Sequence, residues 1–363
     1  MSGNPESGAE FLMVRPRHEG TGYDNADVLQ NDPREAMAQG KSISIAMCTY
    51  NGEKYLQQQL ESIASQTRLP DELVICDDRS TDKTTEIIRN FADAAPFPVR
   101  FNLNPVNLGG AAKGITRNFE QASSLCTGDL IAFCDQDDVW MPQKLARMAQ
   151  TMEQNPQLGG VFVDAQLINA QGVPKGVSLS QTTGMTQHEH RRLRQGKVLP
   201  VLLSMTKVYG CTLMVDASLL RKILPVPPNW WFDAWVPCMV AIHSELAFIP
   251  EQLFYYRIHA NQSGVGASLP SPSERVKQWK YSAKDYWRDS EPQLADLDAR
   301  LATEDRLTIK LYRDYIHGRM ELLRFRAELP SNRFLRAIRV IKRTKDYCQY
   351  FNGWKSIIKD LTA

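Results

Sequence analysis

Between residues 41 and 150 the chain alternates short apolar runs with segments whose apolar residues recur every three or four positions. The apolar runs have the length of buried strands and predict strands at residues 42–49, 73–76, 99–103 and 130–134. The segments between them predict helices, the first of which carries Tyr55, Leu56, Leu60 and Ile63. Strands that alternate with helices form right-handed β-α-β units, so this pattern predicts an α/β domain with a mainly parallel sheet.

The rest of the chain contains further predicted strands, a helical C-terminal region and a polar N-terminal segment. Further apolar runs predict strands at residues 160–168, 211–215 and 246–258, and from about Ser271 the pattern is helical and strongly charged. The first 40 residues are polar and mixed in charge, which is typical of a poorly ordered lead-in. The predicted organisation is a lead-in at 1–40, an α/β domain at 41–266 and a helical region at 267–363.

The segment with the most chemical information is Asp135-Gln136-Asp137-Asp138, which directly follows an apolar run. Ionised carboxylates this close repel one another, and some would become protonated unless a cation held them. Carboxylate oxygens suit Mg²⁺ or Mn²⁺, and such an ion would in turn suit a diphosphate. The alternative is a solvated acidic turn, which the buried-type strand before it disfavours. An EF-hand calcium loop is excluded because Val139 and Trp140 occupy positions that need a ligand and a glycine.

Polar residues also follow two other predicted strands, at Thr49-Tyr50-Asn51 and at Asp77-Asp78. Ligands of parallel sheets bind beyond the carboxyl ends of the strands, so these segments are expected to meet the acidic cluster in one site. A structural alternative is helix capping. Ser80 or Thr81 could cap the next helix, Asp82 is a further cap, and Pro142 suits the first turn of the helix that follows it.

Composition narrows the class of protein. The formal net charge is only +2, which gives no general reason to expect a nucleic-acid partner. The seven cysteines are scattered, without a CxxC pair, and fit free thiols in a reducing compartment. The start lacks the pattern of a secretory signal, and no apolar stretch approaches the roughly 20 residues of a membrane span. We therefore expect a cytoplasmic protein.

The region from Ser42 to about Gly266 resembles the family-2 inverting glycosyltransferases of the GT-A fold. The motifs that carry the resemblance occur in order as Cys48-Thr49-Tyr50-Asn51 with Tyr55-Leu56, Gln66-Thr67, residues 74–82, Asn107-Leu108-Gly109, Asn118-Phe119-Glu120, and Gly128-Asp129-Leu130 before the acidic cluster. The segments at 118–120 and 134–140 look most like bacterial rhamnosyltransferase-type members. The resemblance implies a Rossmann-like, mainly parallel sheet flanked by helices, with a helical C-terminal extension.

The resemblance also implies roles for individual residues. Asp233 matches the general base, although Phe232 stands where many members have an acid or a histidine. Asp135 would face the ribose, and Asp137 would hold a Mg²⁺ or Mn²⁺ ion that bridges the diphosphate, while the role of Asp138 stays open. The late Arg-x-His element would bring Arg257 to the donor and His259 to the metal. The remaining donor-binding residues would be Thr49, Tyr50, Asn51, Glu53 and Asp78.

This chemistry is consistent with inverting transfer, in which an acceptor hydroxyl loses a proton as it attacks the anomeric carbon. The expected donor is a nucleotide-sugar, with dTDP-rhamnose as one option, and the acceptor is a glycan or lipid-linked glycan of bacterial surface polysaccharide or lipopolysaccharide synthesis. Each role has a structural alternative. Asp233 could cap a helix, His259 could be a structural histidine, and Trp230, Trp231 and Trp235 could be core residues or a platform for a sugar ring.

The last 33 residues are basic, with eight lysines and arginines against Asp346 and Asp360. Phe334, Leu335, Ile338 and Ile341 recur on one helical face, and aromatic residues follow. This pattern is typical of a helix that lies on an anionic bilayer, which would place the protein on the inner face of the cytoplasmic membrane. The alternative is an apolar face that packs on the enzyme itself or in a homodimer.

Three other functions compete with glycosyl transfer. A sugar-1-phosphate nucleotidyltransferase would need a Gly-rich phosphate loop with a basic residue after the first strand, where this chain has Thr49 to Glu53. A non-catalytic nucleotide-sugar-binding module would be expected to lack Asp137 or Asp233. A dinucleotide oxidoreductase is disfavoured because no GxGxxG follows the first strand.

Overall fold

The computed structural model describes residues 11–14, 40–109, 112–203, 208–260, 262, 283–351 and 353–362. Most of the predicted lead-in at 1–40 lies outside these residues, although Phe11–Val14 forms an edge strand, β1, that the sequence pattern did not predict. The chain divides into two compact units. The first comprises residues 1–196, 206–226 and 231–267, and the second comprises residues 197–205, 227–230 and 268–363.

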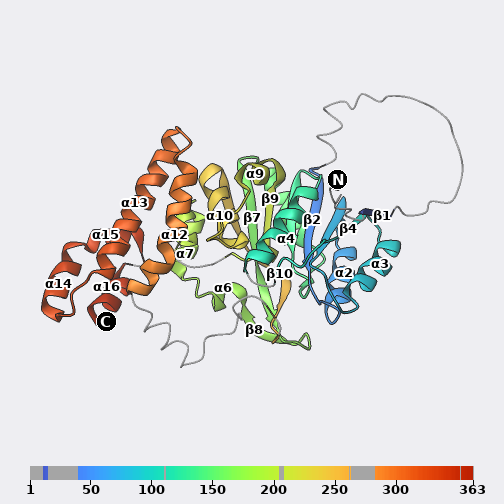
Figure 1. Cartoon of the computed structure of the whole chain (residues 1–363), viewed down its shortest axis with the longest axis horizontal. Coiled ribbons are helices and arrows are strands. Elements are labelled where there is room, and N and C mark those ends of the chain that lie inside the picture. The colour runs from blue at the N-terminus through green and yellow to red at the C-terminus, as the bar shows by residue number, and fades with distance from the viewer. Residues whose placement is uncertain are drawn as a thin grey trace, which may run out of the picture. The chain divides into compact units, whose positions relative to one another are not determined.

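The first unit is built on one sheet with the strand order β1-β4-β3-β2-β5-β9-β7-β10-β6, and β8 pairs with β7 (Figure 1). Its strands are β1 (Phe11–Val14), β2 (Ile43–Thr49), β3 (Glu72–Asp77), β4 (Val99–Leu103), β5 (Leu130–Cys134), β6 (Val139–Trp140), β7 (Leu158–Ile168), β8 (Pro174–Ser178), β9 (Leu213–Asp216) and β10 (Glu245–Arg257). Strands β4, β3, β2 and β5 are parallel to their neighbours within this group, as predicted. The second half is mixed, because β9 runs antiparallel to both β5 and β7.

Helices cover both faces of this sheet, which is why its central strands read as continuous apolar runs. They are α2 (Leu56–Ala64), α3 (Thr84–Ala94), α4 (Ala112–Leu125), α5 (Lys144–Gln154), α6 (Leu179–Thr182), α7 (Gln187–Arg194), the 3₁₀ helix η1 (Gly210–Thr212), α9 (Ala217–Ile223) and α10 (Phe232–His243). On one face Ile45 of β2 joins a core with Leu60 of α2 and Met148 of α5. On the other face, Phe133 of β5 packs against Phe119 of α4 and Phe232 of α10.

Two local predictions were wrong in detail. The strand predicted at 211–215 begins only at Leu213, because Cys211 lies in η1, whose turn closes with a hydrogen bond from Thr212 N to Tyr209 O. Pro142 lies just ahead of α5 rather than in its first turn. Short 3₁₀ turns and helix starts are decided by one or two hydrogen bonds, which an apolar pattern does not encode.

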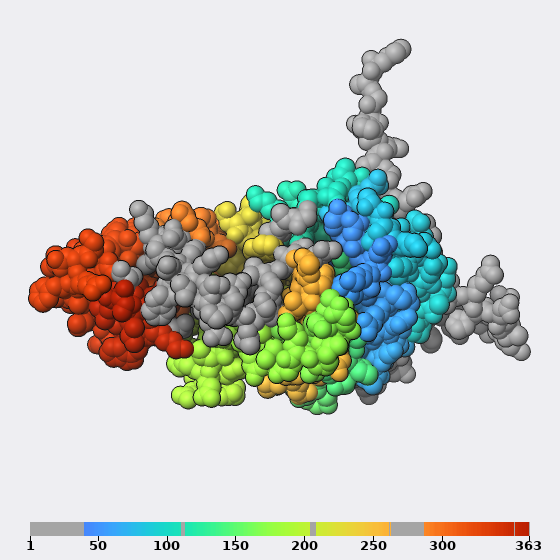
Figure 2. Space-filling model, turned by 90° about the horizontal axis from the view of Figure 1, so that it is seen from below, coloured from blue at the N-terminus to red at the C-terminus, as the bar shows by residue number. Residues whose placement is uncertain are grey.

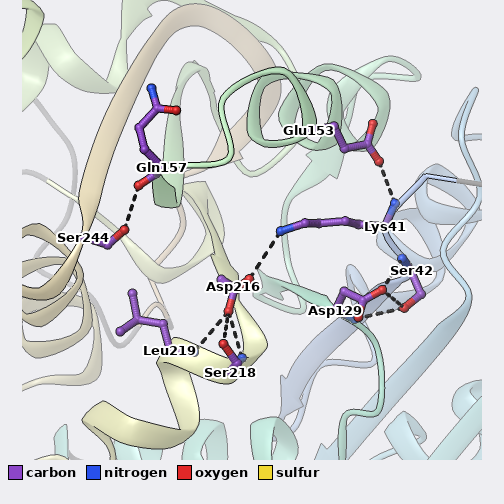
Figure 3. Close-up of polar contacts among 9 residues, drawn as sticks. All are labelled: Lys41, Ser42, Asp129, Glu153, Gln157, Asp216, Ser218, Leu219 and Ser244. Carbon is purple, nitrogen blue, oxygen red and sulfur yellow. Dashed lines mark hydrogen bonds and ion pairs between the residues drawn. The ribbon is translucent and has the colours of Figure 1, made fainter. Parts of the chain in front are cut away.

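Polar contacts hold together the end of the sheet at which the central strands β2 and β5 begin (Figure 3). The backbone N–H of Lys41 donates to Glu153 Oε1 at 2.8 Å, and its Nζ lies 3.4 Å from Asp216 Oδ2. The hydroxyl of Ser42 donates to Asp129 Oδ2 at 2.7 Å, which ties the start of β2 to the start of β5. These contacts fix the register of β2 and β5. The residues that follow the carboxyl ends of these strands therefore lie at the same level across the sheet.

The second unit is helical and comprises α8 (Leu199–Leu202), α12 (Ala283–Leu301), α13 (Leu307–Ala327), α14 (Arg333–Lys342), α15 (Thr344–Tyr350) and α16 (Trp354–Thr362). Its C-terminal helices share a small core of Leu322, Val340, Tyr347 and Ile357. Buried Arg326 of α13 forms a bidentate pair with Asp360 of α16, at 2.6 and 2.9 Å. Among the described residues, no helix has the length and apolar character needed to cross a bilayer.

Candidate active site

A cavity of about 220 Å³ opens at the carboxyl ends of β2, β3 and β5. Its lining includes six residues that the sequence analysis selected, which are Thr49, Tyr50, Asp78, Asp135, Asp137 and Asp233. Asp135 and Asp137 follow β5 directly, whereas Asp233 comes from the first turn of α10, about 100 residues later in the chain. The fold therefore brings the acidic cluster and Asp233 into one cavity.

Hydrogen bonds join the carboxyl ends of β2 and β3 next to Asp78, which lines the cavity. The Thr49 hydroxyl donates to Asp77 Oδ2 at 2.7 Å, and the backbone N–H of Asp78 donates to Thr49 O at 2.9 Å. The carboxylate of Asp78 accepts the backbone N–H of Leu108 at 2.7 Å and the amide of Asn104 at 3.2 Å. Asp78, which lines the cavity, thus ties the loop after β4 to the end of β3.

Asn51 and Glu53 are not among the described residues that line the cavity. Asn51 has a left-handed backbone, with φ of 48°, and its side-chain oxygen accepts the backbone N–H of Thr81 at 2.8 Å. Glu53 accepts the backbone N–H of Lys83 at 3.1 Å. Both residues tie the loop after β2 to the start of α3, and their contact with a donor stays a prediction.

The N-cap position of α3 is Lys83, which makes no side-chain cap bond, so the prediction that Asp82 caps this helix was wrong by one position. Asp82 still supports the start of the helix, because its Oδ1 accepts the backbone N–H of Thr84, the first helical residue, at 3.0 Å. The prediction that Ser80 or Thr81 caps this helix was wrong. The Ser80 hydroxyl instead donates to Asp77 Oδ2 at 2.6 Å, because the turn after β3 folds back on the strand end.

Gln136 is a functional candidate that the sequence analysis missed. Its side-chain Oε1 accepts the backbone N–H of Tyr50 at 2.8 Å, and its Nε2 donates to Tyr50 O at 3.0 Å. A Cβ on Gly52 would come within 2.4 Å of the same amide, so a larger residue there would displace the Gln136 side chain. The signal available in the sequence was an amide between two acids in the cluster, but its pairing with the β2 loop depends on tertiary contact.

Asp137 is held by the end of β10, and Figure 2 shows this segment beside the chain that follows β2. The imidazole Nε2 of His259 lies 2.7 Å from Asp137 Oδ2. Buried Arg257 donates from Nε to Asp137 O at 2.8 Å and from Nη2 to Gln58 Oε1 at 2.7 Å, while its guanidinium lies 4.7 Å from the centre of the Tyr55 ring. Arg257 is therefore a support for the acidic turn, and among the described residues neither it nor His259 lines the cavity.

The acidic cluster is electrostatically crowded. Burial, and then the neighbouring Asp137, raise the pKa of Asp135 to about 7. Burial raises the pKa of Asp138 well above its usual value, and its Oδ2 has no hydrogen-bond partner among the described residues. Buried Lys144 lies behind the cluster, donates to Cys211 O at 2.7 Å and sits 3.8 Å from the centre of the Trp140 ring. Burial lowers the pKa of Lys144 to about 8, so this lysine is a weakened counter-charge.

Two groups of side chains could hold a cation here. Ligand atoms of Asp135, Asp138 and Cys211 lie within 4.8 Å of one another. Burial raises the pKa of the Cys211 thiol, and a protonated thiol is a poor ligand for a hard ion. Asp137 with His259, and Asp135 nearby, offer oxygen and imidazole ligands that fit Mn²⁺ or Mg²⁺ better. Asp137 is therefore the better candidate for a metal ligand, and this role stays a prediction.

Asp233 is fixed by the packing of its neighbour in the chain. The ring of Phe232 stacks on Phe119 with centroids 5.4 Å apart and meets Phe133 edge-on at 4.8 Å. The backbone N–H of Phe232 donates to Thr116 Oγ1 at 3.2 Å. Burial raises the pKa of Asp233 to about 6, so at neutral pH it is an ionised carboxylate that can accept a proton readily.

The three tryptophans near Asp233 in the sequence differ in their burial. Trp235 is fully buried, and its indole N–H donates to Ile223 O at 2.8 Å. Trp230 is also buried, and its indole N–H donates to Gln293 O at 2.9 Å within the second unit. Trp231 is 41% exposed and lines the cavity beside Asp233, so it alone of the three offers a free ring face there.

Comparison with known sequences identifies the region that forms this cavity. The family profile described as Glycosyl transferase family 2 matches residues 44–214, which include the acidic cluster but not Asp233 or His259. An uncharacterized glycosyltransferase of Nostoc sp. is 30% identical over 247 residues, which cover 65% of this chain and 71% of that relative. A protein of Mycobacterium tuberculosis is 26% identical over 243 residues, and the match spans 64% of its length, just under two thirds.

Two further similarities are more limited. The dTDP-rhamnosyl transferase RfbG of Shigella flexneri is 36% identical over 99 residues, which cover 27% of this chain and 34% of RfbG. Among solved structures, S. aureus TarS in complex with UDP-GlcNAc superposes with a TM-score of 0.51 at 18% identity, covering 88% of this chain and 81% of that chain. At this identity the likeness concerns the fold alone, and it agrees with the predicted GT-A architecture.

The GT-A prediction is thus confirmed, with a sheet that is parallel in its first half and mixed in its second. The rhamnosyltransferase resemblance is supported by the short RfbG match. The family profile matches the strands that build the cavity, and the Nostoc relative is 30% identical over 71% of its length. This chain is therefore a member of glycosyl transferase family 2 and hence a glycosyltransferase.

Proposed function

We propose that the protein is a divalent-cation-dependent, inverting glycosyltransferase that moves a sugar from a nucleotide-sugar to a hydroxyl of a glycan or lipid-linked glycan. The observation that carries the proposal is the single cavity lined by Asp135, Asp137 and Asp233. The cavity combines an acidic cluster suited to a metal-bound diphosphate with the carboxylate of Asp233 and the exposed ring of Trp231. The UDP-GlcNAc complex of S. aureus TarS, which shares the fold, is compatible with a nucleotide-sugar at this edge of the sheet.

The proposed reaction is one in-line displacement. The acceptor oxygen forms a bond to the anomeric carbon while the bond from that carbon to the diphosphate oxygen breaks, and the bonding electron pair leaves with the diphosphate. The acceptor proton passes to the carboxylate of Asp233. A bound Mg²⁺ or Mn²⁺ would supply charge stabilisation for the departing diphosphate. Asp137 and His259 would hold this ion, and Asp135 would face the ribose.

The donor and the pathway are the finer part of the proposal. The RfbG match favours dTDP-rhamnose and a place in bacterial surface polysaccharide synthesis, although it covers only 27% of this chain. None of the seven cysteines forms a disulfide within the described part of the chain, which favours a reducing compartment such as the cytoplasm. The rival nucleotidyltransferase is disfavoured because the loop after β2 presents Thr49 and Tyr50 to the cavity and no basic side chain is among its described lining residues.

The function is tested by a donor panel. The purified chain is incubated with dTDP-, UDP- and GDP-linked sugars, with Mg²⁺, with Mn²⁺ or with EDTA, and release of nucleoside diphosphate is measured. We expect sugars linked to one base to be turned over, and EDTA to abolish that turnover. The proposal fails if no donor is bound or hydrolysed with either ion. Formation of a nucleotide-sugar from a nucleoside triphosphate and a sugar-1-phosphate would establish the nucleotidyltransferase instead.

A separate expectation concerns Trp231 as the platform for the acceptor sugar. Replacing Trp231 by Ala should raise the KM for a soluble glycan acceptor about tenfold, because stacking on a sugar ring and the covered apolar area are lost. Trp231→Phe should restore most of the affinity, and the Kd for the donor should change little in either variant. Trp354→Ala removes an exposed tryptophan of the second unit and serves as the matched control. An equal loss of donor affinity in Trp231→Ala would place this ring at the donor instead.

A further inference from the structure

Helix α14 turns most of its apolar side chains outward. Phe334 is 74% exposed and Ile341 is 65% exposed, and Leu335 and Ile338 are exposed as well. Val340 is the one buried residue of this helix. Side chains four and seven positions apart lie on the same side of a helix, so Phe334, Ile338 and Ile341 form one continuous row. Leu335 extends the row on one side, and we call these four residues the α14 row.

The charges around the α14 row have one sign. Arg333, Arg339, Lys342 and Lys345 are exposed, and within the described part of the chain none of them forms an ion pair. The two acids that follow are already engaged. Asp360 is buried in its pair with Arg326, and the carboxylate of Asp346 accepts from Arg343 Nη1 at 2.9 Å. The free charge that this surface presents to a partner is therefore positive.

We infer that α14 docks on an anionic lipid bilayer, with the α14 row at the boundary of the acyl chains and the basic side chains among the lipid head groups. A bilayer of this kind offers an apolar layer directly beneath a negatively charged surface, which matches both features of the helix at once. The inference goes beyond the proposed transfer reaction and rests on different residues. It names the partner of a surface that glycosyl transfer leaves unexplained.

The structure disfavours the two other ways to cover the α14 row, which are packing on the protein itself and pairing in a homodimer. The α14 row does not pack on the described part of the chain, because its side chains remain exposed there. A twofold dimer through this face would place the same surface of two copies together. Arg339, Lys342 and their counterparts in the second copy would then repel one another, with no free acid in α14–α16 to compensate. A bilayer with anionic lipids carries the complementary charge.

Vesicle flotation of the full chain tests the inference. Vesicles of phosphatidylcholine with phosphatidylglycerol are compared with vesicles of phosphatidylcholine alone. Two variants are compared with the wild type, Phe334→Ser/Ile338→Ser/Ile341→Ser and Arg339→Gln/Lys342→Gln/Lys345→Gln. Point variants are better than a truncation, because removing α14 to α16 would expose Leu322 and leave buried Arg326 without Asp360. All the substituted positions are exposed, so both variants should keep the thermal unfolding of the wild type.

We expect the wild type to float with the anionic vesicles and each variant to bind them at least about tenfold more weakly. The matched controls are Val173→Ser, at another exposed apolar residue, and Lys175→Gln/Arg191→Gln/Arg194→Gln, at exposed basic residues of the first unit. Both should bind like the wild type. The inference is overturned if the wild type floats with neither vesicle or equally with both. It is also overturned if sedimentation without lipid reveals a dimer that the serine variant abolishes, since the row would then be a protein interface.

Discussion

Replacing Asp233 by Asn should lower kcat for sugar transfer by about 10²- to 10⁴-fold, the usual contribution of a positioned general base. An amide cannot take the proton that the acceptor hydroxyl loses, so the attacking oxygen would remain protonated as it approaches the anomeric carbon. The Kd for the donor should stay within about twofold of the wild type, because Asn has the shape of Asp and the aromatic contacts of Phe232 that fix α10 are unchanged. Single-turnover kinetics and a donor titration measure the two quantities.

The pH dependence gives this expectation an independent check. The pKa of Asp233 is about 6, and only the ionised form accepts a proton, so kcat/KM of the wild type should fall as the pH drops through 6. The residual activity of Asp233→Asn should lack the limb near pH 6, whereas a limb from Asp135, whose pKa is raised to about 7, should remain. Asp93→Asn, an exposed acid on α3, is the control and should behave as the wild type. A limb near pH 6 that persists in Asp233→Asn, or a matching loss of donor affinity, would remove Asp233 from the role of base.

The second large effect is expected at Asp137. Replacing it by Ala should remove the response to Mg²⁺ or Mn²⁺ and lower kcat/KM about 10²- to 10³-fold, since metal stabilisation of a departing diphosphate is worth several kcal/mol. The substitution removes the carboxylate that lies 2.7 Å from His259 Nε2, while the backbone carbonyl that Arg257 holds is retained. Mn²⁺ titration in the presence of the nucleoside diphosphate measures the loss of the ion directly.

Asp138→Asn is the matched control for this experiment. Burial keeps the pKa of Asp138 high, so its carboxyl is already disposed to be neutral, and an amide oxygen can still accept the backbone N–H of Arg257. We expect this variant to keep most of its affinity for Mn²⁺, whereas His259→Ala should lose part of it. Full activity of the wild type in EDTA would show that no ion takes part, and an Asp138→Asn variant as damaged as Asp137→Ala would move the ion deeper into the cluster.

The first half of the fold could be predicted because its strands are buried on both faces. Such strands read as apolar runs, and parallel pairing brings Thr49, Asp78 and Asp135 to one edge without any knowledge of side-chain contacts. The second half was harder to predict in detail. The antiparallel insertion of β9 between β5 and β7, and the η1 turn before it, follow from pairings between segments about 50 to 80 residues apart.

Some features of the candidate site could not be predicted, because they depend on which side chains the fold buries and on what those side chains then contact. A lysine in a charged helical segment reads as a surface residue, yet Lys144 is buried behind the acidic cluster. No sequence pattern ranks Trp230, Trp231 and Trp235, because they differ in what covers each ring. The hydrogen bonds of the Arg257 guanidinium to Asp137 O and Gln58 Oε1 could not be predicted from the family motif, and its contact with the donor stays a prediction.

The attachment of Asp137 to the end of β10 has a consequence for how the enzyme is made. Both groups that hold this acid, Arg257 and His259, are synthesised more than 100 residues after it. While the ribosome is still translating the middle of the chain, β2 to β5 can already pair and Gln136 can already bond to the backbone of Tyr50, but Asp137 still lacks the two groups that hold it. A nascent polypeptide therefore gains the contacts that hold Asp137 only when β10, the last strand of the sheet to be synthesised, emerges and docks beside β7.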